Sequence, residues 1–170
     1  TMPTPDFPGN SFGQGKNVPA IAMAHGIPYV ATATVADLHD LERKVRYAMS
    51  FHGARYIHIL VPCPLGWGAP SAKTIELARL AHETGLFPVF EAEYGEVTNV
   101  SKIRRKQPVE KYLMLQKRFA HLFGKKGNPE VVQRMQALAD RNIARYGLLG
   151  DEQGDDIPVP EQAEERHHVI

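Results

Sequence analysis

Three short apolar runs separated by helix-like segments constrain the fold of this chain more than any other feature. The runs span residues 29–34, 56–61 and 87–92 and have the length and composition of β-strands. Between them, Asp37 and Ser71 can each cap a helix whose apolar residues recur at helical spacing. Strands that alternate with helices predict right-handed βαβ units. The expected fold class is therefore α/β, with a parallel sheet covered by helices on both faces.

The same pattern predicts which side of each element meets the core. The helix after Asp37 carries apolar residues at helical spacing, which we expect to face inward: Leu38, Leu41, Val45, Ala48 and Met49. The second strand, residues 56–61, is mostly apolar, as in strands buried on both faces of a parallel sheet. We therefore expect it to be the central strand.

The chain has the size of one ordinary domain, since it contains 170 residues with a hydrophobic fraction of 43%. We expect an extended N-terminal loop at 1–16, an α/β core at 17–100, a helical appendage at 101–147 and an acidic tail at 148–170. In the appendage, one helix can begin at Pro108 and run to Gly124, and a second can begin at Asn128-Pro129 and end at Gly147. The tail has too few large apolar residues to order alone, so we expect it to lie on a neighbour. The opening residues begin no element and lack an initiator methionine, which indicates a fragment or a processed product.

Charge and hydropathy exclude several classes of function. The formal net charge is +1, from 20 basic and 19 acidic residues, so no bulk field attracts nucleic acid or an anionic membrane. No apolar run reaches the roughly 18 to 20 residues that cross a bilayer, and the N-terminus lacks the pattern of a signal peptide. A single cysteine excludes an internal disulfide and fits the reducing cytoplasm, where we expect the protein.

That cysteine, Cys63, lies in the segment Pro-Cys-Pro-Leu-Gly-Trp-Gly at residues 62–68. The segment follows the second strand directly, at the carboxyl edge of the sheet, where open α/β folds bind their ligands. From the residues alone, a small buried hydrophobe is the better interpretation of Cys63. A nucleophile would need a neighbouring base, and no Cys-His signature surrounds it. An iron–sulfur site generally needs four thiolates, of which this chain has one.

The other candidate residues give weaker indications of a functional site. The segment 9–16 resembles a phosphate-binding loop, but Asn10 stands where the first glycine is required and no strand precedes it. The eight histidines show no zinc-type spacing. The basic run 102–106 is better explained as a solvated connector than as an anion site. Glu91, Glu93 and Glu96 fit one strand face with a turn, so we assign no residue to catalysis and no residue to cofactor binding.

Four stretches in order resemble the second half of the thiamine-diphosphate-binding (beta) subunit of the pyruvate/2-oxoacid:ferredoxin oxidoreductase family. The first three are residues 21–33, 57–67 and 83–90. The fourth consists of residues 108–113 together with 116–119. The resemblance covers about residues 1 to 123. It implies that the α/β core is part of a thiamine-diphosphate-binding fold.

The resemblance also implies a role for Cys63. In that family the cysteine of the Pro-Cys-Pro-x-Gly-Trp stretch is the distant fourth ligand of a 4Fe-4S cluster, and Cys63 occupies its place. The other three cysteines, and a Gly-Asp-Gly motif that holds thiamine diphosphate through Mg²⁺, lie in the first half of the subunit, and this sequence contains neither. The chain is therefore expected to be inactive alone. Its partners would be that N-terminal half and the other subunits of the oxidoreductase.

The activity implied is the thiamine-dependent oxidative decarboxylation of a 2-oxoacid. Electrons would pass through 4Fe-4S clusters to ferredoxin or another acceptor, and coenzyme A would receive the acyl group. The helix from Pro108 to Phe119 resembles the pyruvate, branched 2-oxoacid, oxalate and aryl-glyoxylate members more than the 2-oxoglutarate type. Two alternatives remain: a non-catalytic α/β interaction subunit with a merely buried cysteine, and a thiamine-dependent decarboxylase without clusters.

Overall fold

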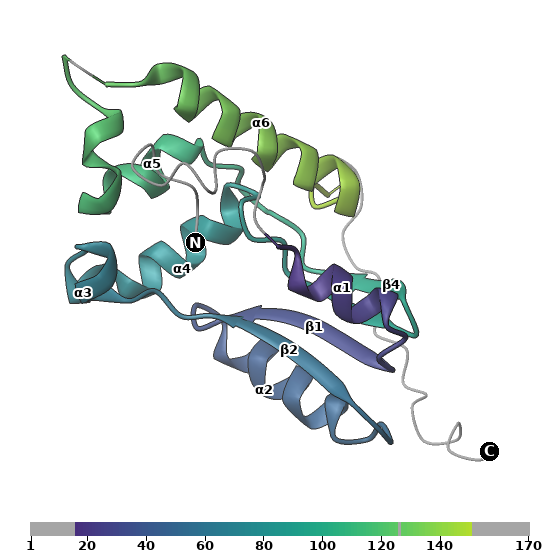
Figure 1. The fold of residues 1–170 in the computed structure, drawn as a ribbon. Coiled ribbons are helices and arrows are strands. Elements are labelled where there is room, and N and C mark those ends of the chain that lie inside the picture. Colours follow the sequence, from purple (N-terminus) through teal and green to yellow (C-terminus); the bar gives the residue numbers. More distant parts are fainter. Residues whose placement is uncertain (1–15, 126, 151–170) are drawn as a thin grey trace.

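The computed structural model describes residues 16–125 and 127–150 (Figure 1). Its elements follow in the order α1 (Val18–Ala24), β1 (Tyr29–Thr34), α2 (Leu38–Ala48), β2 (Arg55–Leu60), α3 (Pro64–Trp67), the 3₁₀ turn η2 (Ser71–Lys73), α4 (Thr74–Glu83), β3 (Phe90–Glu93), β4 (Glu96–Val100), α5 (Val109–Met114), the 3₁₀ segment η3 (Lys117–Leu122) and α6 (Pro129–Tyr146). No helix within these two ranges is both long and apolar enough to cross a bilayer.

The strands form one four-stranded sheet in the order β2-β1-β3-β4. β1 and β2 are parallel, with Tyr29 opposite Arg55 and Thr34 opposite Leu60. Alternate residues of β1 pack on opposite faces, since Val30 contacts the cluster around Ala22 of α1 and Ala31 contacts the cluster around Ala48 of α2. Figure 1 shows α1 and α2 on the two sides of the sheet. The prediction of an α/β fold with helices on both faces is confirmed.

The third strand differs from its prediction in direction. β3 is antiparallel to β1, and it continues into β4 through a tight turn at Tyr94 and Gly95, whose φ angles are 50° and 91°. Two consecutive positive φ angles are typical of the two-residue turns that join antiparallel strands. The sheet is therefore mixed. An apolar run predicts that a strand is buried, but it does not determine the direction in which the strand enters the sheet.

The prediction that residues 56–61 form the central strand is wrong. β2 lies at the edge of the sheet and none of its residues is fully buried, whereas every residue of β1 is. The strand is mostly apolar, as the sequence indicates. Within the described residues, however, no other strand pairs with its outer side.

The inward face of α2 also differs from its prediction. The helix is confirmed, and the Asp37 carboxylate caps it by accepting a hydrogen bond from the Asp40 amide at 2.9 Å. However, the buried residues of α2 are Lys44 and Ala48, and the apolar side chains of Leu38, Val45 and Met49 are exposed. The helix meets the sheet through Ala48, as predicted, and otherwise through the polar contacts of Lys44 and Arg43.

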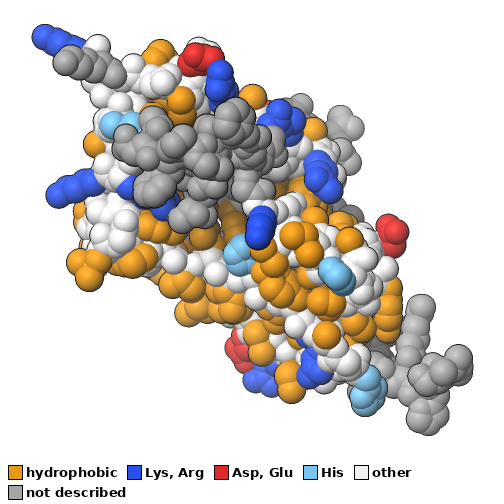
Figure 2. Space-filling view, viewed as in Figure 1, with side chains coloured by type: hydrophobic (Ala, Val, Ile, Leu, Met, Phe, Trp, Pro, Cys, Tyr) orange, Lys and Arg blue, Asp and Glu red, His pale blue; other side chains and the backbone are white. Residues whose placement is uncertain are grey.

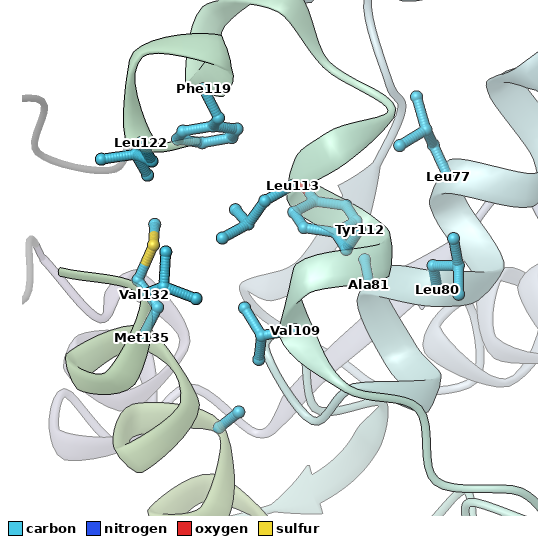
Figure 3. Close-up of a cluster of buried hydrophobic side chains, with 11 residues drawn as sticks. Leu77, Leu80, Ala81, Val109, Tyr112, Leu113, Phe119, Leu122, Val132 and Met135 are labelled. Atoms are coloured by element: carbon cyan, nitrogen blue, oxygen red, sulfur yellow. The ribbon is translucent and has the colours of Figure 1, made fainter. Parts of the chain in front are cut away.

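The largest core cluster lies between α4 and the helices that follow the sheet (Figure 3). It contains Leu77, Leu80, Ala81, Val109, Tyr112, Leu113, Phe119, Leu122, Val132, Met135 and Ala139. The division into a core at 17–100 and an appendage at 101–147 stays a prediction, although this cluster joins residues from both.

The helix boundaries in this region are partly as predicted. α6 is confirmed, with Asn128 as its N-cap and Gly147 as its left-handed C-cap. The helix predicted from Pro108 to Gly124 is divided into α5 and η3, because Gln116 between them is extended and donates its side-chain N–H to the Tyr112 carbonyl at 2.7 Å. Ser71 lies inside η2 and does not cap α4.

Candidate functional site

Cys63 lies in a tight turn just after β2, at the end of the sheet where β1 and β2 both terminate. It is the N-cap of α3, and its Sγ accepts a hydrogen bond from the Gly66 amide at 3.3 Å. The Trp67 amide donates to the Cys63 carbonyl at 2.9 Å. The side chain is exposed, so the interpretation of Cys63 as a buried hydrophobe is wrong. The Cys63 sulfur is therefore held by a hydrogen bond within the turn and is accessible at the surface of the described residues.

Two glycines shape this turn for a physical reason. A Cβ on Gly66 would lie 3.2 Å from the Cys63 Sγ, which is closer than ordinary van der Waals contact, so glycine leaves room for the sulfur. Gly68 ends α3 with φ +63°, and a Cβ there would lie 2.7 Å from the Lys117 Cβ. Glycine is therefore required where the turn meets η3.

Residues of η3 contact the end of the Cys63 turn. The Arg118 guanidinium stacks over the Trp67 ring at 4.1 Å and over the Phe119 ring at 4.7 Å. The Lys117 amide donates to the Gly68 carbonyl at 3.2 Å. Arg118 is half-buried, and burial lowers the pKa of its guanidinium, with Tyr112 acting in the opposite direction. These contacts hold Trp67 and Gly68, at the end of the turn that begins at Cys63, and they join residues too far apart in the chain for the sequence pattern to indicate.

The described residues can supply one ligand to a metal cluster at this site. No group of three or more His, Cys, Asp or Glu side chains comes together anywhere in 16–125 or 127–150. The exposed sulfur of Cys63 is the one thiol available to such a cluster, and the Gly66 amide is placed to donate to it. Any remaining ligands would have to come from elsewhere.

Two open depressions lie away from this turn. One is lined by α1, the β3–β4 turn and the end of α6, including Met23, Gly95 and Tyr146. The other is lined by residues that follow η3 and by α6, including Phe123 and Gln133. Neither is lined by Cys63. Neither depression therefore forms part of the Cys63 turn.

Glu91, weighed above as a possible acid, has a structural role. Its buried carboxylate accepts hydrogen bonds from Tyr29 at 2.7 Å, from Arg43 at 2.6 Å and from Asn99 at 2.9 Å. Burial by itself would raise the pKa of Glu91, but these three donors outweigh it and hold the pKa below its ordinary value. The network ties α2 to β1, β3 and β4. Glu93 accepts a hydrogen bond from Tyr47 at 2.9 Å, which adds a second contact between α2 and β3.

The remaining candidates are structural or lie outside the described residues. His58 packs edge-to-face against Phe87, and burial lowers its pKa. The basic run 102–106 is a connector: Lys102 donates to the Gly147 carbonyl at 2.7 Å and Lys106 pairs with Asp140 at 2.8 Å. The predicted loop at 1–16 falls outside the described residues except for Lys16, and the tail does so from residue 151 onward.

Comparison with known proteins gives strong similarity to one kind of subunit. No family model matches the chain. The pyruvate synthase subunit PorB of Methanosarcina barkeri is 50% identical over 133 residues, which cover 78% of this chain and 45% of the relative. PorB of Pyrococcus furiosus is 38% identical over 86% of this chain and 47% of the relative. The ketoisovalerate oxidoreductase subunit VorB of Pyrococcus abyssi is 43% identical over 70% of this chain and 38% of the relative. The chain thus spans less than half the length of these relatives.

Proposed function

Because this chain belongs to the family of 2-oxoacid:ferredoxin oxidoreductase beta subunits, we propose that it forms the Cys63-bearing half of such a subunit. Its complex would catalyse the oxidative decarboxylation of a 2-oxoacid with ferredoxin or a similar acceptor, in the cytoplasm. The chain would be inactive alone, since it spans less than half of its relatives and brings one thiol to the site.

In this proposal Cys63 is one ligand of a 4Fe-4S cluster. The observation that carries it is the exposure of the Cys63 sulfur at the carboxyl edge of the sheet, in a turn fastened by Arg118 and Trp67. The Gly66 amide would donate to the coordinated sulfur, and the stack would limit movement of the turn when the charge of the bound group changes. The other three ligands would come from the part of the subunit outside this sequence.

Thiamine diphosphate with Mg²⁺ would supply the carbon–carbon bond cleavage, the clusters the single-electron transfer and coenzyme A the acceptor of the acyl group. We assign no residue of this chain to thiamine, Mg²⁺ or coenzyme A, which would be held mainly by the missing half or by partner subunits. The described part of this chain would cover one side of the site and orient one cluster ligand.

Pyruvate is the substrate that the similarities favour. The relatives named pyruvate synthase range from 37% to 50% identity and include the highest value, and those named ketoisovalerate oxidoreductase lie within that range at 43%. Rates of acceptor reduction with pyruvate, 2-ketoisovalerate and 2-oxoglutarate would rank in that order, and a preference for 2-oxoglutarate would contradict the assignment.

Substitution of Cys63 tests the cluster ligand in the purified complex. We expect Cys63→Ala to lose iron and labile sulfide equivalent to one cluster, and to lose acceptor reduction while substrate binding remains. Ser71→Ala is the matched control, because Ser71 is exposed in the nearby η2 turn and its hydroxyl makes no hydrogen bond within the described residues. A full cluster content in Cys63→Ala would exclude this role.

The same preparations separate the two alternatives. A complex with bound thiamine but no iron would indicate a decarboxylase without clusters. A colourless complex with neither thiamine nor iron would indicate a non-catalytic interaction subunit.

A further inference from the structure

The charges of this chain are divided unequally between two parts of it. The tail at residues 151–170 contains seven Asp or Glu residues and one Arg, which gives it a formal charge of −6 with histidine neutral. Because the whole chain carries +1, residues 1–150 carry +7. The near-neutral total therefore conceals a basic part and an acidic tail, which attract each other.

Part of the positive charge lies beside the point where the tail begins. Arg141 and Arg145 are one turn apart on α6, so they share a face of that helix. Arg104 and Arg105 lie in the connector between β4 and α5. We call these four residues the basic strip.

The connector runs along the end of α6 and holds the start of the tail next to the basic strip. Ile103 pairs with Leu149 in an isolated parallel bridge, and the Lys106 Nζ donates to the Asp140 carboxylate at 2.8 Å. The tail begins two residues after Leu149. Its first acidic residues are therefore close to the arginines of the strip.

The arginines of the basic strip have no acidic partner within the described residues. All four side chains are exposed, and none of them takes part in an ion pair there. The neighbouring acid, Asp140, pairs with Lys106. Figure 2 shows Lys and Arg side chains spaced along α6 on the face seen there. The strip can therefore accept carboxylates from a segment outside the described residues.

The depression between α1 and α6 meets the basic strip at Arg145. It has a volume of about 500 Å³ and is lined mainly by apolar side chains of α1 and β4, together with Arg145 and Tyr146. Figure 1 shows α1, β4 and the end of α6 close together. The Tyr146 ring stacks on the buried Phe90 ring with 4.8 Å between the ring centres. An apolar depression with an aromatic wall thus continues the basic strip.

The tail has the order of residues that this surface would accept. Asp151, Glu152, Asp155 and Asp156 come first, and the run Ile157-Pro158-Val159-Pro160 follows. Alternating prolines favour the polyproline II conformation, which docks in aromatic-lined grooves at a low cost in entropy. The acidic residues match the strip, and the apolar run matches the depression.

The tail is long enough to reach the depression. Gly150 is four residues from Tyr146, so their Cα atoms are at most about 14 Å apart. The seven residues from Gly150 to Ile157 span up to about 23 Å when extended. The chain can therefore turn back at Gly150 and bring the apolar run over the depression.

We propose that the acidic tail docks on its own chain, with residues 151–156 along the basic strip and residues 157–160 in the depression between α1 and α6. Charge complementarity and the reach of the tail support this occupant. The surface is separate from the Cys63 turn, since Cys63 does not line the depression. The proposal therefore does not rest on the proposed function.

Photo-cross-linking from the tail tests the docking in the purified complex. We expect Val159→p-benzoylphenylalanine to form links to the lining of the depression in the same chain, at Met23 or Val97. Val169→p-benzoylphenylalanine is the matched control, because it lies in the same tail beyond the docked run and should lose these links. A mixture of isotope-labelled and unlabelled chains shows whether a link joins residues of one copy. Links to another copy or to another subunit, or no links, would overturn the proposal.

Proteolysis of the same complex tests the basic strip. A glutamate-specific protease cuts after Glu152. We expect the combined variant Arg141→Gln and Arg145→Gln to be cut about tenfold faster than the parent protein at low salt, because surface ion pairs that hold the tail are lost. Arg79→Gln is the matched control, since Arg79 on α4 is also exposed but lies outside the strip. Equal cleavage of the combined variant and this control would contradict the proposal.

Salt gives a second measure in the same experiment. The Debye length falls from about 10 Å at 0.1 M salt to about 3 Å at 1 M. The ratio of the two cleavage rates, combined variant to parent, should therefore fall toward one at 1 M salt. A ratio that does not change with salt would show that charge does not hold the tail and would overturn the proposal.

Discussion

The Arg118 guanidinium lies 4.1 Å from the centre of the Trp67 ring, although the two residues belong to segments far apart in the chain. Trp67 forms the last residue of α3, whose first turn is capped by Cys63. Arg118 belongs to η3, which packs into the largest core cluster through Phe119 and Leu122. The turn that holds the only cysteine is thus connected to the main hydrophobic core through this cation–π contact and through Trp67 and Ala69, which pack against the same cluster.

Replacement of Arg118 should loosen the Cys63 turn. We expect Arg118→Ala to lower the free energy of unfolding by about 1–2 kcal/mol, since a partly desolvated cation–π contact and its packing are lost. Amides 66–69 should exchange faster in the variant. Arg79→Ala, at an exposed position on α4, should change the stability by less than about 0.5 kcal/mol. Unchanged exchange in the turn would show that Arg118 does not hold it.

Gly68 and Gly26 offer a matched pair of glycine substitutions. Both have a left-handed backbone, with φ +63° and +69°, so alanine strains each by about 1 kcal/mol. Only at Gly68 would the new Cβ collide with another segment, at 2.7 Å from the Lys117 Cβ. Thermal unfolding should therefore show a larger loss for Gly68→Ala than for Gly26→Ala. Equal losses would indicate that η3 moves aside without resistance.

Lys44 and Arg46 form equivalent ion pairs on α2 in different surroundings. Lys44 is buried and donates to Asp40 at 2.6 Å and to the Thr32 carbonyl at 2.9 Å, whereas Arg46 pairs with Glu42 at the surface. Lys44→Met should lower the free energy of unfolding by about 3 kcal/mol, because the buried Thr32 carbonyl and the Asp40 Oδ2 atom lose their Lys44 donor, while Arg43 still binds Asp40 Oδ1. Arg46→Met should cost less than about 1 kcal/mol. Denaturant titration of both variants checks the difference, and equal midpoints would refute it.

Glu91 should make stability depend on pH in the acid range. Its pKa in the folded protein lies below the ordinary value, so its contribution is fully present above an ordinary pKa of about 4.3 and is lost as the pH falls through the folded pKa. At pH 7, Glu91→Gln should lower the free energy of unfolding by about 1–3 kcal/mol. The difference from the parent protein should shrink below about pH 4.3.

Glu96→Gln is the control for this pH series, because Glu96 is an exposed residue of the same hairpin. Its stability should follow that of the parent protein from neutral to acid pH. A difference for Glu91→Gln that stays constant with pH would mean that the lowered pKa of Glu91 is not what stabilises the network.

The local elements were predictable wherever a single segment carries its own signal. Asp37 and Asn128 cap the helices expected from them, and β1 has the bounds of its apolar run. The candidate site was predictable in position, since Cys63 follows β2 directly at the carboxyl edge. Its exposure was not, because the composition of a turn does not say whether another segment covers it.

The sequence by itself determined the α/β class, the positions of most helices and strands, and the place of the only cysteine, because these follow from local periodicity, capping residues and chain order. Only the tertiary structure decided that β2 is an edge strand, that α2 meets the sheet through Lys44 and Arg43, and that Arg118 holds the Trp67 turn. These features depend on contacts between residues distant in the chain. A segment shows the same apolar pattern in the sequence whether the residues that cover it are near to it or far from it in the chain.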